Sequence, residues 1–351
     1  MSGGVDSSIA AALLKELGYS VIGVTMKTWG GETFPVGGKH HGCYGPGEEE
    51  DVEDARKVAR ILNIPFLVFD LRQEFKNEVL DYLRNIYMSG QTPNPCVRCN
   101  SRIKFDALEK KVKDSGIPFD YFASGHYARV EYDESKSRHL LKKARDLQKD
   151  QSYFLFSLSQ EQLSHSLFPL GNLTKDEVRR MAFSLGLDVV HKPESQDFAD
   201  GRHLAFFTDP VHPGPIINRD GKVLGQHNGI QYYTIGQRKG LGIAARKPLY
   251  VIAIDETLNN ITVGSKNEVY GDELIASEVN WISVNSLKQT KKAIVKIRNL
   301  HIGAEAIITP LDNMKVHIKF KEPQMAIAPG QAAVFYEGDS VLGGGTIKKA
   351  G

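Results

Sequence analysis

Two short stretches of the 351-residue sequence bring together residue types that can do chemistry. The first is residues 2–8, which read Ser-Gly-Gly-Val-Asp-Ser-Ser, and the second is residues 96–99, Cys-Val-Arg-Cys. Glycines let a backbone approach an anion closely, and the thiolate is the nucleophilic and metal-binding form of cysteine. We therefore expect an anion site at the first stretch and sulfur or metal chemistry at the second.

The glycine-rich string leads directly into an amphipathic segment that ends at Gly18. Its apolar residues recur at helical spacing, at Ile9, Ala12, Leu13 and Leu17. Ser7 and Ser8 are expected to cap this helix, whose first N–H groups would bind phosphate. The string is not a Walker A loop, because no lysine followed by Ser or Thr comes after the second glycine. The ordinary alternative is a glycine-rich turn ahead of a helix.

The composition is that of a globular protein with room for two or three domains. Hydrophobic residues make up 41% and charged residues 25% of the chain. No apolar run approaches the roughly 20 residues of a membrane span, and nothing resembles a signal peptide. The net charge of +2 is too small to indicate nucleic-acid binding by itself. Three cysteines do not form a secreted disulfide framework, so we expect a reducing cytoplasm.

Strand and helix patterns alternate over the first part of the chain. We predict strands at 21–26, 66–70 and 121–124, and helices at 50–62 and 75–88. This alternation predicts an α/β domain with a parallel sheet covered on both faces. Ligands of such sheets bind at the carboxyl ends of strands, where Met26, Asp70 and Gly125 fall. Because a phosphate loop normally follows a buried strand, and the sequence begins at Met1, we expect the first strand to be missing.

The pattern of apolar residues changes from helical periodicity to short β-strand-like runs in the second part of the chain. Thr174 and Glu177 form a capping box ahead of a helix that Gly186 closes. Beyond residue 203 the helical periodicity disappears, and short β-branched runs alternate with turns. This pattern predicts two small β modules, at 204–270 and 271–351, after an α/β domain at 1–203.

The cysteine pair lies in a segment with two prolines. Pro93 and Pro95 exclude a helix across 93–95, so we expect the thiols on a stiff loop. Arg98, Arg102 and Lys104 are positive neighbours that favour the thiolate. A different possibility is half of a structural zinc site, whose other ligands would come from the glycine-rich loop at 28–50. That loop supplies His40, His41 and Cys43.

Several strings together resemble the tRNA-specific 2-thiouridylases of the ATP-pyrophosphatase (PP-loop) family. Ser2–Ser8 and the TPNPxxxCNxxIKF pattern of residues 92–105 carry the resemblance. Further matching strings occur in family order, at 124–129, 149–155, 166–171, 236–242 and 334–339. The resemblance implies a PP-loop ATP-pyrophosphatase domain, a small β-rich central domain that binds tRNA, and a C-terminal β-barrel domain.

The resemblance implies conversion of uridine to 2-thiouridine at the wobble position (U34) of the tRNAs for Lys, Glu and Gln. ATP, with Mg²⁺, adenylates O2 of the base, and a sulfur carried by the enzyme displaces AMP. The wobble base is single-stranded and can be splayed into a pocket at modest cost. The implied partners are the anticodon stem-loops and a sulfur donor such as a cysteine desulfurase or relay protein, with no membrane.

The resemblance also assigns residues. ATP binding falls to Met1, Ser2, Gly3, Gly4, Val5, Asp6, Ser7, Met26 and Gly125. The residues implied to contact the target base are Asn94, Pro95 and Cys96. Those implied to contact other parts of the tRNA are His126, Lys149, Asp150, Gln151, Arg298, Asn299 and Gln331. Cys96 and Cys99 are the implied catalytic thiols. Each polar residue alone has a solvated surface position as its ordinary alternative.

The sequence departs from the family pattern at two positions. Ala199 stands where family members carry the cysteine that bears the persulfide, and Cys96 stands where they carry Asp. In one interpretation Cys43, Cys96 and Cys99 ligate a [4Fe–4S] cluster whose open iron binds sulfide. In the other, Cys99 carries a persulfide and Cys96 resolves it as a disulfide. We favour the cluster because it uses all three thiols, although Cys43 alone could be an ordinary thiol.

Two other functions are compatible with parts of the sequence. One is a catalytically impaired tRNA-binding paralogue, which the missing thiol at 199 and the missing first strand favour. The intact string at 2–8 argues against this paralogue. Another PP-loop ligase, such as an amidotransferase synthetase or a lysidine synthetase, would share that string. No glutaminase segment is present, however, and such a ligase leaves the cysteine pair and the GQRKGLG string unexplained. The leading interpretation is a tRNA-uridine 2-sulfurtransferase.

Overall fold

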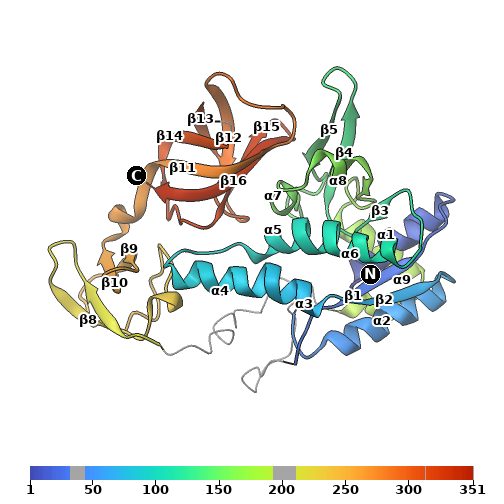
Figure 1. The fold of residues 1–351 in the computed structure, drawn as a ribbon, viewed down its shortest axis with the longest axis horizontal. Helices are drawn as coiled ribbons and strands as arrows, with labels where there is room; N and C mark the ends of the chain where they lie inside the picture. Colours follow the sequence, from blue (N-terminus) through green and yellow to red (C-terminus); the bar gives the residue numbers. More distant parts are fainter. Residues whose placement is uncertain (32–43, 193–210, 313, 351) are drawn as a thin grey trace. The chain divides into compact units, whose positions relative to one another are not determined.

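The computed structural model describes residues 1–31, 44–192, 211–312 and 314–350 (Figure 1). The chain forms two compact units, each treated by itself here. Unit 1 comprises Met1–Val79, Cys96–Ala205 and Asp339–Val341, and unit 2 comprises Leu80–Pro95, Phe206–Gly338 and Leu342–Gly351. Among the described residues, no helix is long and apolar enough to cross a membrane.

Unit 1 has the parallel strand pairing that the alternation predicts. β1 (Gly23–Lys27) pairs in parallel with β2 (Phe66–Asp70), and β3 (Phe122–Ala123) pairs in parallel with β6 (Ser166–Leu167). Three helices share one apolar core, in which Ile9 and Val178 are fully buried. These helices are α1 (Val5–Glu16), α2 (Glu48–Ile61) and α9 (Lys175–Ser184). The register of β1 on β2 places Lys27 opposite Asp70, so the carboxyl ends of both strands meet at one edge.

A longer helical run forms where the sequence predicts a helix at 75–88. It consists of α3 (Arg72–Phe75), a π-helical stretch (Lys76–Leu80) and α4 (Asp81–Met88). The run starts in unit 1 and continues into unit 2. The other helices of unit 1 are α5 (Pro95–Cys99), a π-helix (Asn100–Ala107), α6 (Leu108–Asp114), α7 (Ser152–Leu155), α8 (Gln160–Ser164) and a 3₁₀ turn (Asp188–His191).

The expectation that the thiols sit on a loop is wrong. α5 begins at Pro95 and contains both cysteines. Proline is tolerated in the first turn of a helix because its missing N–H has no partner to lose there, and its fixed φ is already helical. The two prolines therefore fix where the helix starts and do not exclude it.

An antiparallel hairpin completes unit 1. It is formed by β4 (Ala128–Asp133) and β5 (Arg138–Lys143). Asp339 also belongs to unit 1, although it lies far along the chain. Its carboxylate forms an ion pair with Arg129 Nη2 at 2.7 Å. The Lys143 N–H donates to the Asp339 carbonyl at 2.8 Å. The hairpin is therefore held by Asp339, which lies 210 residues after Arg129 in the sequence, between the last two strands of the chain.

Unit 2 is built from β-strands, as the loss of helical periodicity beyond residue 203 predicts. Its first sheet has the order β8-β7-β10-β9, made of β7 (Gly214–Ile217), β8 (Val223–His227), β9 (Tyr250–Asp255) and β10 (Asn260–Gly264). Ile216, Val251 and Ile261 are fully buried in its core. Short 3₁₀ turns lie at Ile230–Tyr232 and Lys266–Val269.

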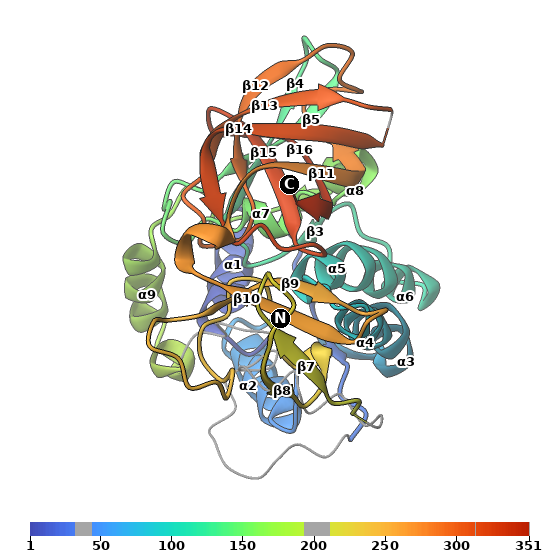
Figure 2. The same cartoon turned by 90° about the vertical axis from the view of Figure 1, so that its left-hand side faces the viewer.

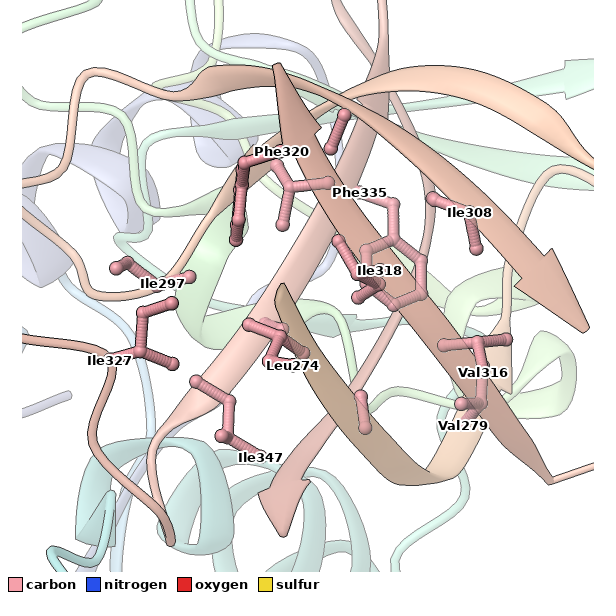
Figure 3. Packing of buried hydrophobic residues seen from close by; sticks show 14 of the residues in the cluster. Leu274, Val279, Ile297, Ile308, Val316, Ile318, Phe320, Ile327, Phe335 and Ile347 are labelled. Atoms are coloured by element: carbon pink, nitrogen blue, oxygen red, sulfur yellow. The ribbon is translucent and has the colours of Figure 1, made fainter. Parts of the chain in front are cut away.

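The remaining strands form a closed six-stranded barrel (Figures 1 and 2). They are β11 (Tyr270–Trp281), β12 (Lys291–Lys296), β13 (Ala304–Pro310), β14 (Lys315–Met325), β15 (Ala332–Glu337) and β16 (Ser340–Ala350), and β11 closes the ring by pairing with β16. Alternate residues of a barrel strand face inward. Figure 3 shows Leu274, Ile318 and Phe335 meeting in this way, and all are buried.

Candidate functional site: the loop at the start of α1 and the cysteine helix

The glycine-rich string makes a tight turn into α1. Gly3 has a φ of +68°, and a Cβ there would collide with the main chain of Asp51, so only glycine fits. Gly4 is the N-cap of α1, and no side chain caps the helix. The expected serine caps are wrong: the hydroxyls of Ser7 and Ser8 donate to the Gly4 carbonyl, at 3.2 and 2.8 Å. Hydroxyls inside the first turn reach back to a carbonyl, which leaves the N–H groups of the helix start for an anion.

Asp6 is held by two other side chains of unit 1. Lys175 Nζ donates to its carboxylate oxygens at 2.7 and 2.8 Å, and the Tyr127 hydroxyl donates to Oδ1 at 2.9 Å. Lys175 is only 6% exposed, a burial that a lysine tolerates when it is paired. Its Nζ also lies 5.7 Å from the centre of the Tyr127 ring. These contacts, which we call the Asp6 network, neutralise the carboxylate and fix it beside the start of α1.

A further pair of hydrogen bonds holds Tyr127 in place. The Tyr127 N–H donates to Gln151 Oε1 at 2.9 Å, and the Gln151 N–H donates to the Tyr127 carbonyl at 2.8 Å. Asp150 accepts from the Ala144 N–H at 3.1 Å and from the Ser152 hydroxyl at 3.0 Å. Two residues predicted to contact tRNA therefore make internal bonds, and one of them is linked to Asp6 through Tyr127.

Gly125 lies directly against the loop. A Cβ at this position would be 2.7 Å from Asp6 C and Ser7 N, which is closer than real side chains come to a backbone. Met26, the other residue predicted to line the adenosine, lies near the carboxyl end of β1 opposite Phe69. The structure thus brings Gly125 against the loop and places Met26 on the neighbouring strand pair.

The other residues of the string support the turn. The Ser2 N–H donates to Ser7 Oγ at 3.1 Å. Val5 is 7% exposed and joins the core beneath α1. The Met1 ammonium donates to the Val24 carbonyl, so the residue ahead of the loop lies beside β1.

Lys175, which no motif above includes, has a signal in the sequence. Thr174 and Glu177 make both hydrogen bonds of the predicted capping box, and Lys175 is the first helical residue after the cap. A cation at a helix N-terminus is opposed by the helix dipole. A lysine there must therefore serve something outside its own helix, which in this case is Asp6.

Cys96 and Cys99 lie three residues apart on α5, a spacing that puts two side chains on one side of a helix. Cys99 is buried, Cys96 is partly exposed, and neither is in a disulfide. Arg98 is turned toward Glu78: its Nη2 lies 2.6 Å from Oε2, and its Nε donates to the Glu78 carbonyl at 3.2 Å. Its charge is therefore balanced by a carboxylate, so Arg98 favours the thiolates less than expected.

Cys43, His40 and His41 lie outside the described residues, so the structure places two of the three predicted cluster ligands. Within the described ranges, no group of three or more His, Cys, Asp or Glu side chains is placed to hold a metal ion. Ala199 also lies outside the described residues.

The helix that follows the thiols is wound as a π-helix over Asn100–Ala107. Phe105 leaves the helical conformation, with φ −100° and ψ 20°. Gln162 Nε2 compensates by donating to the carbonyls of Ser101 and Phe105, at 3.1 and 2.6 Å. A π segment shifts side chains around the helix axis and is frequent at functional sites. The buried Asn100 amide donates to the Phe154 carbonyl at 3.1 Å, which anchors the turn after Cys99.

His126 sits between aromatic rings. Its Nδ1 lies 2.7 Å from Ser124 Oγ, and its ring centre lies 6.2 Å from those of Phe105 and Phe168. Burial holds the pKa of His126 well below its ordinary value, and the charge of Lys104 lowers that pKa further. At neutral pH the imidazole is uncharged, so it can offer a hydrogen bond or a stacking face to RNA but no positive charge.

Gln331, predicted to contact tRNA, holds another part of unit 2. Its Nε2 donates to the carbonyls of Thr92 and Pro93, at 3.2 and 2.8 Å. The Thr92 N–H donates to the Pro329 carbonyl at 2.8 Å. Gly330 has a φ of +90°, and a Cβ there would lie 2.7 Å from the Thr92 carbonyl oxygen. The barrel segment at 329–331 thus fixes the residues just before Asn94 and Pro95.

Arg298 and Asn299 lie in the loop after β12. Arg298 Nη1 donates to the Met325 carbonyl at 2.9 Å. The same loop exposes Leu300 and Ile302 almost completely, at 89% and 96%. These residues belong to unit 2, whereas the Asp6 network and both thiols belong to unit 1.

Comparisons with known proteins match the chain from end to end. Family models match in three consecutive segments: a tRNA methyl transferase HUP domain at residues 1–199, a tRNA methyl transferase PRC-barrel domain at 207–265, and an aminomethyltransferase beta-barrel domain at 271–347.

Full-length relatives agree with these matches. The chain is 47% identical over 352 residues to the tRNA-specific 2-thiouridylase MnmA of Endomicrobium trichonymphae, an alignment that covers 99% of this chain and 97% of the relative. The proteins of the same name from Acetivibrio thermocellus and Moorella thermoacetica are 46% and 48% identical, each with 99% of this chain and 98% of the relative covered. The strings at 2–8 and 92–105 and the α/β, PRC-barrel and barrel order thus have one common explanation: the chain belongs to the tRNA-specific 2-thiouridylase (MnmA) family.

Proposed function

We propose that this protein thiolates C2 of the wobble uridine (U34) in the tRNAs for Lys, Glu and Gln at the expense of ATP. The observation that supports the proposal is the start of α1, where no side chain caps the helix and Asp6 is held by Lys175, in a member of this family. The division of labour we propose is catalysis by residues 1–203, tRNA binding by 204–270 and a supporting barrel at 271–351. The reaction takes place in the cytoplasm.

The activation step uses the loop. The N–H groups at the start of α1 bind the β- and γ-phosphates, and Asp6 is the carboxylate available to the Mg²⁺ that accompanies ATP. O2 of the base attacks the α-phosphorus, the P–O bond to the β-phosphate breaks, and pyrophosphate leaves. Lys175 and Tyr127 keep Asp6 in one position during this exchange, so that little reorganisation is needed in the transition state.

The sulfur step needs a nucleophile that expels AMP from C2. In the persulfide interpretation, the terminal sulfur on Cys99 attacks C2, and the C2–O bond breaks as AMP leaves. The Cys96 thiolate then attacks Cys99 Sγ, which releases the 2-thiouridine and leaves a Cys96–Cys99 disulfide. An external thiol reduces that disulfide for the next turnover. The spacing of the two thiols on one side of α5 supports this route.

In the cluster interpretation, Cys43, Cys96 and Cys99 hold a [4Fe–4S] cluster, which would supply the sulfide. Cys96 and Cys99 are not in a disulfide and would supply two of its ligands. In either case the sulfur arrives from a donor such as a cysteine desulfurase or a relay protein.

Replacement of Cys43 distinguishes the two interpretations. If a cluster is used, Cys43→Ala abolishes iron binding and thiolation in anaerobically reconstituted protein. If the persulfide route is used, Cys43→Ala keeps thiolation, and mass spectrometry finds the additional sulfur on Cys99. Iron and sulfide analysis of the same samples provides a readout that does not depend on activity.

The function itself is tested by mass spectrometry of tRNA nucleosides. A strain that lacks its own 2-thiouridylase should regain 2-thiouridine at U34 when this gene is supplied. Binding of tRNA without release of pyrophosphate would identify a catalytically impaired paralogue instead, and a modified cytidine would identify a lysidine synthetase.

A further inference from the structure

One loop of unit 2 lies within residues 204–270, which we propose to bind tRNA, and carries charges to which no role has been given so far. We call residues 237–248 the basic loop; it connects the 3₁₀ turn at Ile230–Tyr232 to β9. It contains two Arg–Lys pairs and no acidic residue, and all four side chains are exposed: Arg238, Lys239, Arg246 and Lys247. None of the four forms a salt bridge with another described residue.

Several other exposed cations of unit 2 are neutralised by carboxylates, in contrast to the four of the basic loop. On the barrel, Lys319 lies 2.7 Å from Asp272 and Lys321 lies 2.9 Å from Glu305. The whole chain has a net charge of only +2. Four unbalanced charges within ten residues therefore make a local positive potential that the net charge hides, and such a potential attracts polyanions.

The backbone of the basic loop is fixed at its ends. The Gly236 N–H donates to the Val251 carbonyl at 2.8 Å, and the Val251 N–H donates to the Gln237 carbonyl at 3.0 Å. The Gln237 side chain accepts from the Thr234 N–H and donates to the Lys239 carbonyl, each at 3.1 Å. The first Arg–Lys pair is therefore presented on an ordered turn.

The middle of the loop is anchored in the core. Leu241 is 7% exposed and packs in the cluster that contains Ile216 and Val251. Gly240 and Gly242 on either side of it have φ values of +78° and +66°, which glycine adopts at no steric cost. The chain therefore turns inward to bury Leu241 and returns to the surface after it. The Arg238–Lys239 pair is exposed before Leu241, and the Arg246–Lys247 pair is exposed after it.

We propose that the basic loop binds the sugar–phosphate backbone of RNA and that it supplies affinity that does not depend on base sequence. Its identification with tRNA rests on the function proposed above. The loop contains no aromatic residue on which a base could stack, and its one amide side chain, Gln237, is already bonded to the Thr234 N–H and the Lys239 carbonyl. The exposed residues between the two pairs are small, and they let a phosphate backbone approach but offer no large apolar anchor for a protein partner: Gly240, Gly242, Ala244 and Ala245.

Salt dependence measures this role. Each phosphate neutralised by Arg or Lys contributes about 0.7 to 0.9 to the slope of log affinity against log salt. Replacing one pair, as R238Q/K239Q or R246Q/K247Q, should reduce the slope by about 1.5 and weaken binding of unmodified tRNA-Lys transcript roughly tenfold at low salt. The loss should be the same for an unrelated tRNA, because no base is read.

A matched control lies on α2. Arg56 and Lys57 are also an Arg–Lys pair, but each is already paired, with Glu53 and Asp54, both at 3.2 Å. R56Q/K57Q removes the same charge from the full-length protein and should leave the slope unchanged. A thermal melt of each variant shows whether it is folded.

The possible results separate this inference from the proposed function. If the loop variants are folded and keep the wild-type slope, or if the control loses as much, the inference is overturned while thiolation by the wild type still supports the function. If the loop variants lose RNA affinity but the wild type makes no 2-thiouridine, the inference stands and the function fails. Slower sulfur delivery from a donor protein with unchanged RNA binding would show that the loop docks a protein, and would overturn it.

Discussion

The start of α1 and the basic loop are both suited to phosphate, but their charges are arranged in opposite ways. At the start of α1 the Asp6 carboxylate is matched by a buried lysine, and the binding groups are backbone N–H groups in a fixed turn. In the basic loop four cations face solvent with no described carboxylate beside them. We expect the first arrangement to position a small ligand for reaction and the second to attract a large polyanion from a distance.

The difference also concerns salt. Exposed charges are screened within about 10 Å at 0.1 M salt, while a buried pair is screened much less. We therefore expect salt to weaken tRNA binding through the basic loop and to leave the geometry at Asp6 intact. The following variants test each side of this comparison.

Lys175→Met should have the largest effect. It leaves the Asp6 carboxylate without its cation, and loss of one preorganised charged or polar group at a reacting centre raises the barrier by about 3 kcal/mol. Release of pyrophosphate should fall about a hundredfold or more, because 2.7 kcal/mol corresponds to two powers of ten, while the Kd for tRNA should stay within a factor of two or so. Lys113→Met, an exposed lysine on α6, serves as the control. Normal pyrophosphate release by folded Lys175→Met would show that the Asp6 network has no catalytic part.

Tyr127→Phe should have an intermediate effect. It removes one hydrogen bond to Asp6 and keeps the ring against Lys175. A hydrogen bond to a charged group contributes about 1.5 to 3 kcal/mol, so pyrophosphate release should fall roughly tenfold or somewhat more. Single-turnover measurements at saturating ATP report this change. If only tRNA affinity falls, then Tyr127 acts through Gln151 on RNA binding and not through Asp6.

Glu109, a buried carboxylate, gives the smallest effect and tests whether another acid of unit 1 is balanced like Asp6. Glu109 Oε2 lies 2.7 Å from His165 Nε2, and its Oε1 has no partner among the described residues. Burial raises the pKa of Glu109, an effect that His165 and Lys113 only partly offset. An acid whose pKa is raised by folding stabilises the fold at low pH, and this contribution is lost as the pH rises through the folded pKa.

Glu109→Gln should therefore gain in Tm relative to the wild type as the pH rises from about 4 toward 8, by a few degrees at most. Differential scanning calorimetry across this range measures the gain. A Tm difference that does not change with pH would show that Glu109 is balanced as completely as Asp6.

Local patterns predicted those features that local forces decide. The strand Phe66–Asp70 and the capping box of Thr174 and Glu177 occur where they were expected. The change to β-structure beyond residue 203 was also visible, because alternation and turn residues act over a few neighbours. The segment that starts at Pro95 was predicted as a loop and is a helix. Proline can either start or break a helix, and the neighbouring residues alone do not decide between the two.

The rest depends on contacts between distant residues. Lys175 lies 169 positions after Asp6, and no periodicity relates the two. In the same way, nothing in residues 80–95 indicates that they pack with the second half of the chain. Family strings located the loop and the thiols, but they did not show that Tyr127 and Lys175 meet at Asp6, and only the tertiary structure reveals these bonds.

The hold of Pro329 and Gln331 on Thr92 and Pro93 has a consequence for how the protein is made. During synthesis the N-terminal part of a chain emerges from the ribosome first, and domains generally fold as they emerge. The segment before Cys96 has to wait for residue 331, long after the loop at the start of α1 has emerged. A nascent or truncated chain that ends before the barrel can complete the loop at the start of α1 but not the fixed arrangement of Thr92 and Pro93. Synthesis thus finishes the part that we propose to bind ATP first, and the segment before the proposed base contacts last.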